Sequence, residues 1–333
     1  MLSVCTVFGS GRKIGTVGAP ELMIPMGARN VALGGANVAN VFGVESIYWN
    51  PAGLARVANM EATVNYMTYF ADMTVTYMAA GASLGNVGRI GLSIQSLEIG
   101  DIPVTTIESP EGTGEVIAPD YITVTGTFSR AITDRFNFGA NVKVVTEAIG
   151  NMNASAFAFD LGLQYVSSAT GVGFGVVMRN IGGRVKFDGT SIEFDSDVPW
   201  SDPSATTRKT KLDMASHEIP ASLVMGVSYA LNLGESQSIN IASSFNNENF
   251  ALNSVNMGAE YNLNNTLFLR GGYASLLYPE DYEESVKESV YTGLSMGLGV
   301  KLAFGGGELN LDYAYRAMEV FSANQYFGIT ASF

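Results

Sequence analysis

From Glu61 to the C-terminus, the chain repeats one pattern in which apolar residues alternate with polar residues or glycine. In residues 308–316, for example, one face of an extended strand carries Leu309, Leu311, Tyr313 and Tyr315. The same alternation recurs in residues 157–165 and 294–302, where the second face is polar or glycine. In a soluble β-sandwich, which shows the same alternation, the apolar faces of two sheets pack against each other. Here the apolar faces are numerous enough to encircle the molecule, so we predict that they face lipid.

The composition is that of a membrane protein without membrane helices. Charged residues make up only 15% of the chain, and 38 of its 333 residues are glycine. We find no uninterrupted apolar run near the roughly 20 residues that a helical span requires. Only helices and closed barrels satisfy every backbone hydrogen bond inside hydrocarbon. The predicted fold class is therefore all-β, an antiparallel transmembrane β-barrel.

Alternation and turn residues together predict fourteen strands. We expect them at residues 60–70, 72–84, 87–99, 119–131, 135–148, 153–167, 171–181, 217–231, 236–246, 249–263, 266–276, 288–304, 307–319 and 324–333. The number is even, as bacterial single-chain barrels require when both ends lie on the periplasmic side. If the first strand runs outward, the three longest gaps are all extracellular connections: 100–118, 182–216 and 277–287.

The segment 26–57 fits neither strand nor membrane helix. It is rich in glycine and alanine, which let one backbone approach another closely. Asn50 followed by Pro51 is typical of a helix start, with the asparagine as cap and proline at the first helical position. We therefore expect a short helix over residues 51–57, preceded by a bulky anchor made of Ile47, Tyr48 and Trp49. The segment is predicted to be enclosed by the wall that follows it.

The runs GARNVALGGANVAN and IYWNPAGLA in this segment resemble the N-terminal hatch of the FadL-like outer-membrane barrels, and most closely the PorV/PorQ branch. The resemblance covers about thirty residues, and for the rest of the chain it is one of architecture. It implies a 14-stranded barrel, integral to the bacterial outer membrane, with a small hatch, or plug, inside. The implied hatch residues are Gly27, Arg29, Leu33, Gly34, Gly35, Tyr48, Trp49, Asn50, Pro51, Gly53 and Leu54.

These features divide the chain into three parts. Residues 1–15 are expected to be a tail that retains the apolar end of a secretory signal, residues 16–59 the hatch, and residues 60–333 the barrel. Leu2 to Cys5 faintly resembles a lipoprotein box, but Val4 is a poor residue before the cysteine. Cys5 is the single cysteine, which excludes an internal disulfide and any multi-cysteine metal site.

Strand alternation directs several charged side chains into the lumen, where they must pair or contact water. They are Lys143, Asp160, Arg179, Glu260, Lys301, Asp312 and Arg316. The last strand ends on an aromatic residue, which resembles the signal read by the outer-membrane barrel-assembly machinery. Its lipid-facing residues are expected to be Phe327, Ile329 and Phe333.

The motifs for chemistry are weak, and we expect no enzyme and no cofactor. Gly293 to Gly297 matches the G-x-S-x-G elbow of hydrolases, but no helix pattern follows it, and the only histidine, His217, precedes the serine. Acidic residues gather in the three long loops. Such clusters suit Ca²⁺ or cation bridges to lipopolysaccharide, although a solvated acidic surface is the simpler interpretation because calcium-loop spacing is absent. The net charge of −13 argues against nucleic acid.

Two functions remain. The closer resemblance implies a PorV/PorQ-type barrel for protein export and surface attachment, as in type IX secretion. Its partners would be secretion-system or cargo proteins, captured by outer loops that include the apolar residues Pro199 and Trp200. The broader resemblance implies a FadL-like channel for hydrophobic compounds such as long-chain fatty acids. A structural or adhesive surface barrel is a third and weaker interpretation. The inward faces are mainly Ser, Thr, Asn, Gly and charge, which favours the first.

Overall fold

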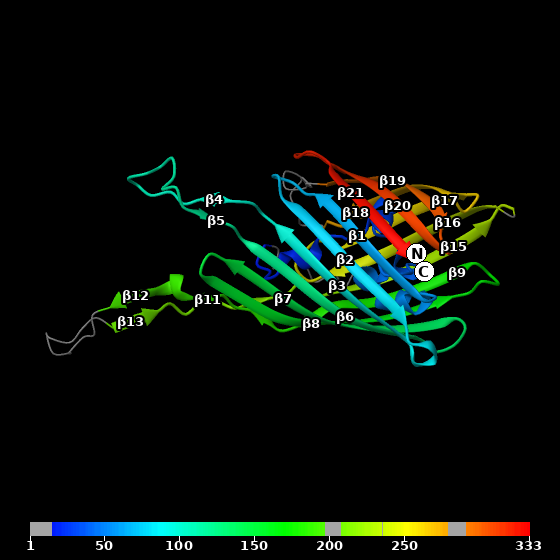
Figure 1. Cartoon of the computed structure of the whole chain (residues 1–333), viewed down its shortest axis with the longest axis horizontal. Coiled ribbons are helices and arrows are strands. Elements are labelled where there is room, and N and C mark those ends of the chain that lie inside the picture. Colours follow the sequence, from blue (N-terminus) through cyan, green and yellow to red (C-terminus); the bar gives the residue numbers. More distant parts are fainter. Residues whose placement is uncertain (1–14, 197–207, 235, 279–290) are drawn as a thin grey trace, which may run out of the picture.

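The computed structural model describes residues 15–196, 208–234, 236–278 and 291–333. Fourteen long antiparallel strands form a closed barrel (Figure 1). The barrel closes where the first strand, β1, pairs with the last strand, β21. β8 also pairs with β9, so the ring of strands is complete. The barrel strands are β1 (Met60–Thr68), β2 (Thr74–Ser83), β3 (Arg89–Glu98), β6 (Asp120–Ala131), β7 (Phe136–Ile149), β8 (Met152–Val166), β9 (Val172–Gly182), β15 (Ser222–Asn232), β16 (Gln237–Glu248), β17 (Ser254–Leu263), β18 (Leu267–Leu276), β19 (Tyr291–Phe304), β20 (Gly307–Met318) and β21 (Asn324–Ser332).

The predicted number of strands is confirmed, and most predicted bounds lie within three residues of the observed ones. The expected strand 217–231 is wrong at its start, because Pro220 has no N–H to donate and interrupts the ladder. β15 begins only at Ser222, and His217–Glu218 form a separate short strand, β14. The expected strand 249–263 also starts late, at Ser254, because residues 249–253 form a turn in which Asn253 accepts a hydrogen bond from the Glu248 N–H.

The longest connections leave the barrel at one end (Figure 1). One carries the hairpin of β4 (Ile102–Pro103) and β5 (Val116–Ile117). The other carries β10 (Arg184–Val185), β11 (Asp188–Gly189), η5 (Thr190–Ile192), β12 (Glu193–Ser196), β13 (Arg208–Lys211) and β14. The opposite end has short turns, such as η4 (Gly85–Val87). Outer-membrane barrels place long loops outside and short turns in the periplasm, so these ends are the extracellular end and the periplasmic end.

The wall has two chemically different faces. On β8, Phe157 and Leu161 point outward, 62% and 48% exposed, whereas Asp160 between them is fully buried. On β20, Leu311 and Tyr315 are exposed on the outer face, as predicted. An apolar outer surface around a closed barrel is the surface that a bilayer covers.

The hatch fills the lumen as five short helical segments: η1 (Pro20–Met23), α1 (Ala28–Ala32), η2 (Asn37–Ala39), α2 (Ser46–Trp49) and η3 (Pro51–Arg56). It follows the inner wall around its circumference. α1 packs on β18 to β21, η2 on β8, β9, β15 and β16, and η3 on β3, β6, β7 and β8. The expected helix at 51–57 is thus a 3-10 helix that ends at Arg56.

No helix in the described ranges is both long and apolar enough to cross a membrane.

Glycines on the inner wall let the hatch backbone approach closely. A Cβ at Gly139 would collide with the Pro51 carbonyl group, and one at Gly162 would collide with the Asn50 side chain. Gly272 faces the backbone at Leu33 and Gly34 in the same way. The glycines of the alternating pattern therefore make room for a second layer of chain inside the barrel.

Candidate functional site

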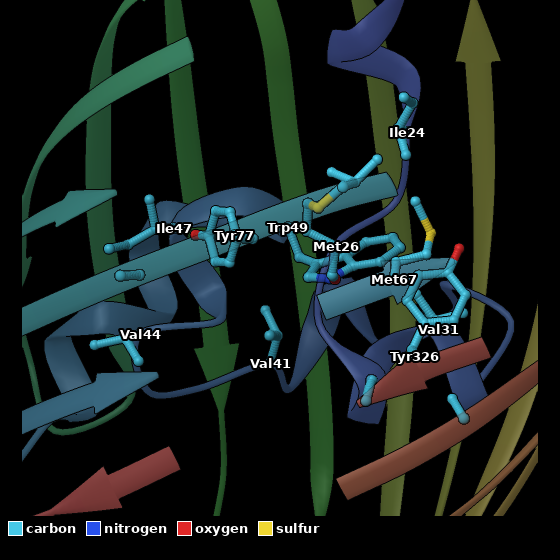
Figure 2. Packing of buried hydrophobic residues seen from close by; sticks show 14 of the residues in the cluster. Ile24, Met26, Val31, Val41, Val44, Ile47, Trp49, Met67, Tyr77 and Tyr326 are labelled. Carbon is cyan, nitrogen blue, oxygen red and sulfur yellow. The ribbon is translucent and has the colours of Figure 1, made fainter. Parts of the chain in front are cut away.

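An apolar surface lines the extracellular half of the lumen. It is formed by buried, inward-facing side chains from neighbouring strands, namely Met67, Val75, Tyr77, Leu97 and Tyr326. The hatch residues Ile24, Met26, Val31, Ile47 and Trp49 pack against it (Figure 2). The inward faces are mainly polar, as expected, but the sequence did not predict this apolar surface. Each strand contributes only one or two apolar inward residues, too few to notice in its own sequence, but the barrel brings them together.

The polar inner residues have a specific task, which is to hold the hatch backbone. The Gln164 amide donates to the carbonyl oxygens of Val38 and Val41, at 3.1 and 3.0 Å. The Asn141 amide donates to the Ile47 carbonyl oxygen at 2.8 Å. Buried carbonyl groups require such partners. The Ser, Thr and Asn residues of the wall thus anchor the hatch as well as lining space.

Trp49 and Asn50 fix the centre of the hatch. The Trp49 side chain is 8% exposed, and its indole Nε1–H donates to the Met26 carbonyl oxygen at 2.7 Å. Asn50 is fully buried, and its side-chain oxygen accepts from the Ala52 N–H, as expected of a cap. Its amide also donates to the Leu163 carbonyl oxygen of β8, at 3.2 Å. One asparagine therefore caps η3 and ties the hatch to the wall.

The remaining hatch residues of the resemblance lie in this packed layer. Leu33 and Leu54 are almost completely buried. Gly27, Gly34 and Gly35 have positive φ angles of 84°, 65° and 74°, which only glycine adopts without strain. A Cβ at Gly53 would collide with the Val41 carbonyl oxygen.

An ion cluster joins α1 to the periplasmic half of the wall. Arg29 binds Glu260 through two hydrogen bonds, Nε to Oε2 at 3.0 Å and Nη2 to Oε1 at 2.9 Å. Arg270 also binds Glu260, at 2.6 Å, and donates to Asp312 at 2.5 Å. Arg29, Arg270 and Asp312 border a cavity of about 100 Å³. Its other lining residues include Phe42, Glu61, Lys301 and Asn310. The cluster is a latch between hatch and wall.

Glu45 belongs to the same latch and was missed by sequence reasoning, because hatch residues have no alternation that predicts their orientation. It is buried, and the Asn30 amide donates to its carboxylate at 2.8 Å. Burial raises the pKa of Glu45 from 4.5 to about 8, and nearby Asp312 adds to the increase. Arg29 and Arg270 act in the opposite direction. Burial therefore favours the protonated form of this carboxyl group.

A second buried ionic group lies where β8 and β9 lose regular register. Lys143 Nζ is 2.8 Å from Asp160 Oδ2 and donates to Asn180 Oδ1 at 2.7 Å. Asp160 also accepts from the Asn141 amide and from the Asn180 N–H, both at 2.7 Å. Asn180 has a φ of 55°. The ion pair thus stabilises an irregular piece of wall.

The other predicted residues lie apart. Arg179 is 3.9 Å from Glu248, and Lys301 is 2.5 Å from Glu308 at the periplasmic end. Arg316 lies opposite Ser295 in the β19–β20 pairing. Phe327, Ile329 and Phe333 are exposed on the outer surface. Pro199 and Trp200 fall outside the described residues.

Another acidic residue of the hatch, Glu21, was also missed. It is 1% exposed, and burial raises its pKa from 4.5 to about 8, with Glu147 of β7 facing it. The Gln95 amide donates to the Glu21 main-chain carbonyl oxygen at 2.9 Å, which holds η1 against β3. No local pattern marks Glu21, because its burial results from the packing of η1 against the wall near Gln95 of β3 and Glu147 of β7.

The chain is similar in fold to solved outer-membrane channels. The CymD monoaromatic hydrocarbon channel superposes with a TM-score of 0.58 at 14% identity, over 92% of this chain and 97% of that one. The Ralstonia pickettii toluene transporter TbuX gives 0.58 at 13%, over 92% and 98%. A Pseudomonas aeruginosa FadL homologue gives 0.52 at 10%, over 92% and 98%. No protein-family model and no curated protein matches the sequence.

These similarities show the fold. The chain therefore has the fold of these channels, a closed barrel of fourteen strands with a hatch within it and an apolar outer surface.

Proposed function

We propose that this protein is a hatch-gated channel for the uptake of small hydrophobic molecules. The observation that carries the proposal is the apolar surface of the inner wall, which the hatch covers in this structure and which includes Met67 and Leu97 packed with Trp49. A molecule that leaves water for this surface gains about 25 cal/mol for each Å² of apolar area it buries. Tyr69, Met73, Ile99 and Tyr121 extend the surface toward the extracellular loops.

The fold relatives support this choice between the two functions that the sequence left open. CymD is a monoaromatic hydrocarbon channel, and TbuX is a toluene transporter. At 13–14% identity they support the fold rather than the cargo, so the apolar surface of this chain must carry the argument.

The gating part of the proposal rests on the hatch. Because the hatch contacts most of the wall, passage requires that part of it moves. The periplasmic cavity of about 100 Å³ lies beyond the Arg29 latch, where cargo would emerge. Release of the latch would join the apolar surface to this cavity.

The test is uptake by cells, because lipopolysaccharide is the barrier that hydrophobic molecules cannot pass unaided. Cells that produce the barrel should accumulate radiolabelled toluene or a long-chain fatty acid faster than cells without it. Leu97→Gln places a polar group in the apolar surface and should reduce the rate several-fold. The control is Val116→Gln on the exposed β4–β5 hairpin, compared at an equal amount of barrel protein in the outer membrane. Equal uptake with and without the barrel would refute the channel.

A second candidate function is capture of protein partners, as the PorV/PorQ resemblance implies. Its specific support is that the β4–β5 and β12–β13 hairpins project beyond the barrel, and that Ile107 in the first is 97% exposed (Figure 1). Deletion of about ten residues around Pro199 and Trp200 should then abolish co-purification of partners from native outer membrane, without unfolding the barrel. Retention of every partner would remove this function.

A further inference from the structure

A small polar cavity lies between the hatch and the wall, at the inner limit of the apolar surface. Its volume is about 10 Å³, which is roughly the space for one water molecule or one small polar group. Leu22, Ile47 and Tyr48 of the hatch form one side. Tyr77, Thr123 and Lys143 of the wall are on the other side. The cavity is therefore apolar toward the hatch and polar toward the wall.

Two polar atoms of this cavity are not fully satisfied within the described part of the chain. The Thr123 Oγ1 atom has no hydrogen-bond partner, and the Tyr77 hydroxyl group has only the neighbouring Ser93 side chain, which also lines the cavity. Tyr77 is 2% exposed and Thr123 is 3% exposed. A buried hydroxyl without a hydrogen bond costs about 1–3 kcal/mol. Their presence at one cavity indicates that this place is built to receive a polar group.

The strand register places Tyr77 and Thr123 in the same row across three neighbouring strands. Tyr77 of β2 is opposite Gln95 of β3, and Gln95 is opposite Thr123 of β6. Gln95 is already committed to the Glu21 carbonyl oxygen. The hydroxyl groups on either side of it remain able to donate and to accept hydrogen bonds.

The charge around the cavity selects against an ionised guest. Lys143 is 5% exposed and has its charge balanced by Asp160 at 2.8 Å. Two of its three N–H groups point to Asp160 and Asn180, so one is left for a guest. A carboxylate would enter without a free counter-ion, and a buried charge without a partner is costly. A neutral hydroxyl group requires no compensation.

We propose that this cavity is a subsite for a single uncharged hydroxyl group on an otherwise hydrophobic molecule, such as a phenol. The inference rests on the proposed function and adds the chemistry of the cargo. The guest hydroxyl hydrogen-bonds to Tyr77 and Thr123, while its ring lies against Tyr48 and the apolar surface. The cavity of about 10 Å³ has room for the hydroxyl group alone, so the ring requires a movement of Leu22 of η1, which lines the cavity.

The test uses three ring compounds of similar size, with fluorine as the reporter. Binding of 4-fluorophenol, 4-fluorotoluene and 4-fluorobenzoate is measured by ¹⁹F NMR on the full chain in lipid nanodiscs. Tyr77→Phe and Thr123→Val should each lower the affinity for 4-fluorophenol about threefold to tenfold, the effect of losing one neutral hydrogen bond. The affinity for 4-fluorotoluene should change by less than twofold. The matched controls are Tyr66→Phe and Thr76→Val, whose side chains lie on the outer face of β1 and β2.

Each result separates the subsite from the channel. If 4-fluorotoluene binds and the variants do not weaken 4-fluorophenol selectively, the subsite is refuted and the channel stands. If no ring compound binds the native protein, both fail. If 4-fluorobenzoate binds most tightly and Lys143→Met abolishes its binding, the site takes anions and the neutral class is refuted. A lower unfolding temperature of Tyr77→Phe would place the hydroxyl in a structural role and refute the subsite.

Discussion

At the scale of single residues, the hatch depends on a few charged side chains that reach across the lumen. Arg29 and Glu260 are 231 positions apart in sequence, yet two hydrogen bonds join them. The guanidinium fork matches a carboxylate in a way that an ammonium group does not. Glu45 lies beside this pair with a raised pKa, so we expect proton binding by Glu45 to be coupled to the latch.

Arg29→Lys should loosen α1 without unfolding the barrel. A lysine keeps the charge but loses the two-pronged contact, so the free energy of local hatch opening should fall by about 1–3 kcal/mol. Hydrogen exchange of the amides of residues 28–32 measures this change. Arg184→Lys is the matched control, because its pair with Glu218 is exposed. Unchanged exchange in the Arg29 variant would contradict the latch.

The hatch should also loosen as the pH rises. A raised pKa means that the folded state prefers neutral Glu45, so this contribution is complete below pH 4.5 and is lost as the pH rises toward and through about 8. Trp49 fluorescence in a Trp200→Phe background should report the loss. Glu45→Gln, which mimics the protonated acid, should reduce the pH dependence in this range and leave the part due to Glu21, whereas Glu115→Gln in the exposed loop should not change it. A pH profile that is identical in the Glu45 variant would exclude Glu45 as its source.

At the scale of elements, wall and hatch fit through glycine and backbone rather than through large side chains. η3 lies on β7 so closely that Gly139 has no space for a Cβ beside Pro51. Inner-wall asparagine, glutamine and serine residues then bind the carbonyl groups of the hatch. Each helical segment is too short to be stable alone, so the wall gives the hatch its structure.

Gly139→Val should therefore displace the hatch and leave the strands in place. Overpacking of this kind costs about 1–3 kcal/mol or more, and here the clash is with backbone, which cannot rotate away. Mild protease should then cut between Gly34 and Asn50, while the barrel keeps its heat-modifiable migration on gels. Gly126→Val on the outer face of β6, with nothing within 4 Å, is the control. Protection equal to that of the native protein would show that the hatch adjusts.

At the scale of the whole molecule, closure joins the two ends of the wall. β21 pairs with β1 from Glu61 to Thr68, and the Phe333 N–H donates to the Met60 carbonyl oxygen at 2.9 Å. The Phe333 ring is exposed to lipid, beside Phe304 at 6.0 Å. An aromatic ring in this place contributes little to the inner packing, which leaves assembly as its proposed task.

Removal of Phe333 should slow insertion into the outer membrane rather than destabilise the finished barrel. Pulse-chase labelling in cells measures the rate at which the heat-modifiable form appears. Phe304→Ala removes the same ring contact but keeps the terminal residue, so it should insert at the native rate. If the truncated chain inserts as fast as the native one, the terminal aromatic residue is not an assembly signal.

The sequence by itself determined the wall. A period of two is a local property, so the alternation predicted the fourteen strands and the outward orientation of Leu311 and Phe157 without knowledge of strand partners. The helix cap at Asn50 and Pro51 was also predictable from the sequence, because a cap depends on a few adjacent residues.

Only the tertiary structure decided which side chains meet inside the barrel. Alternation tells that Met67, Tyr77, Leu97 and Tyr326 point inward, but it does not give their height in the barrel. That height follows from the stagger of each strand against its neighbours. The same stagger brings Glu260 to Arg29 and places Tyr77 level with Thr123. Hence the apolar surface, the latch and the polar cavity arise from register, a relation between strands that no single stretch of sequence contains.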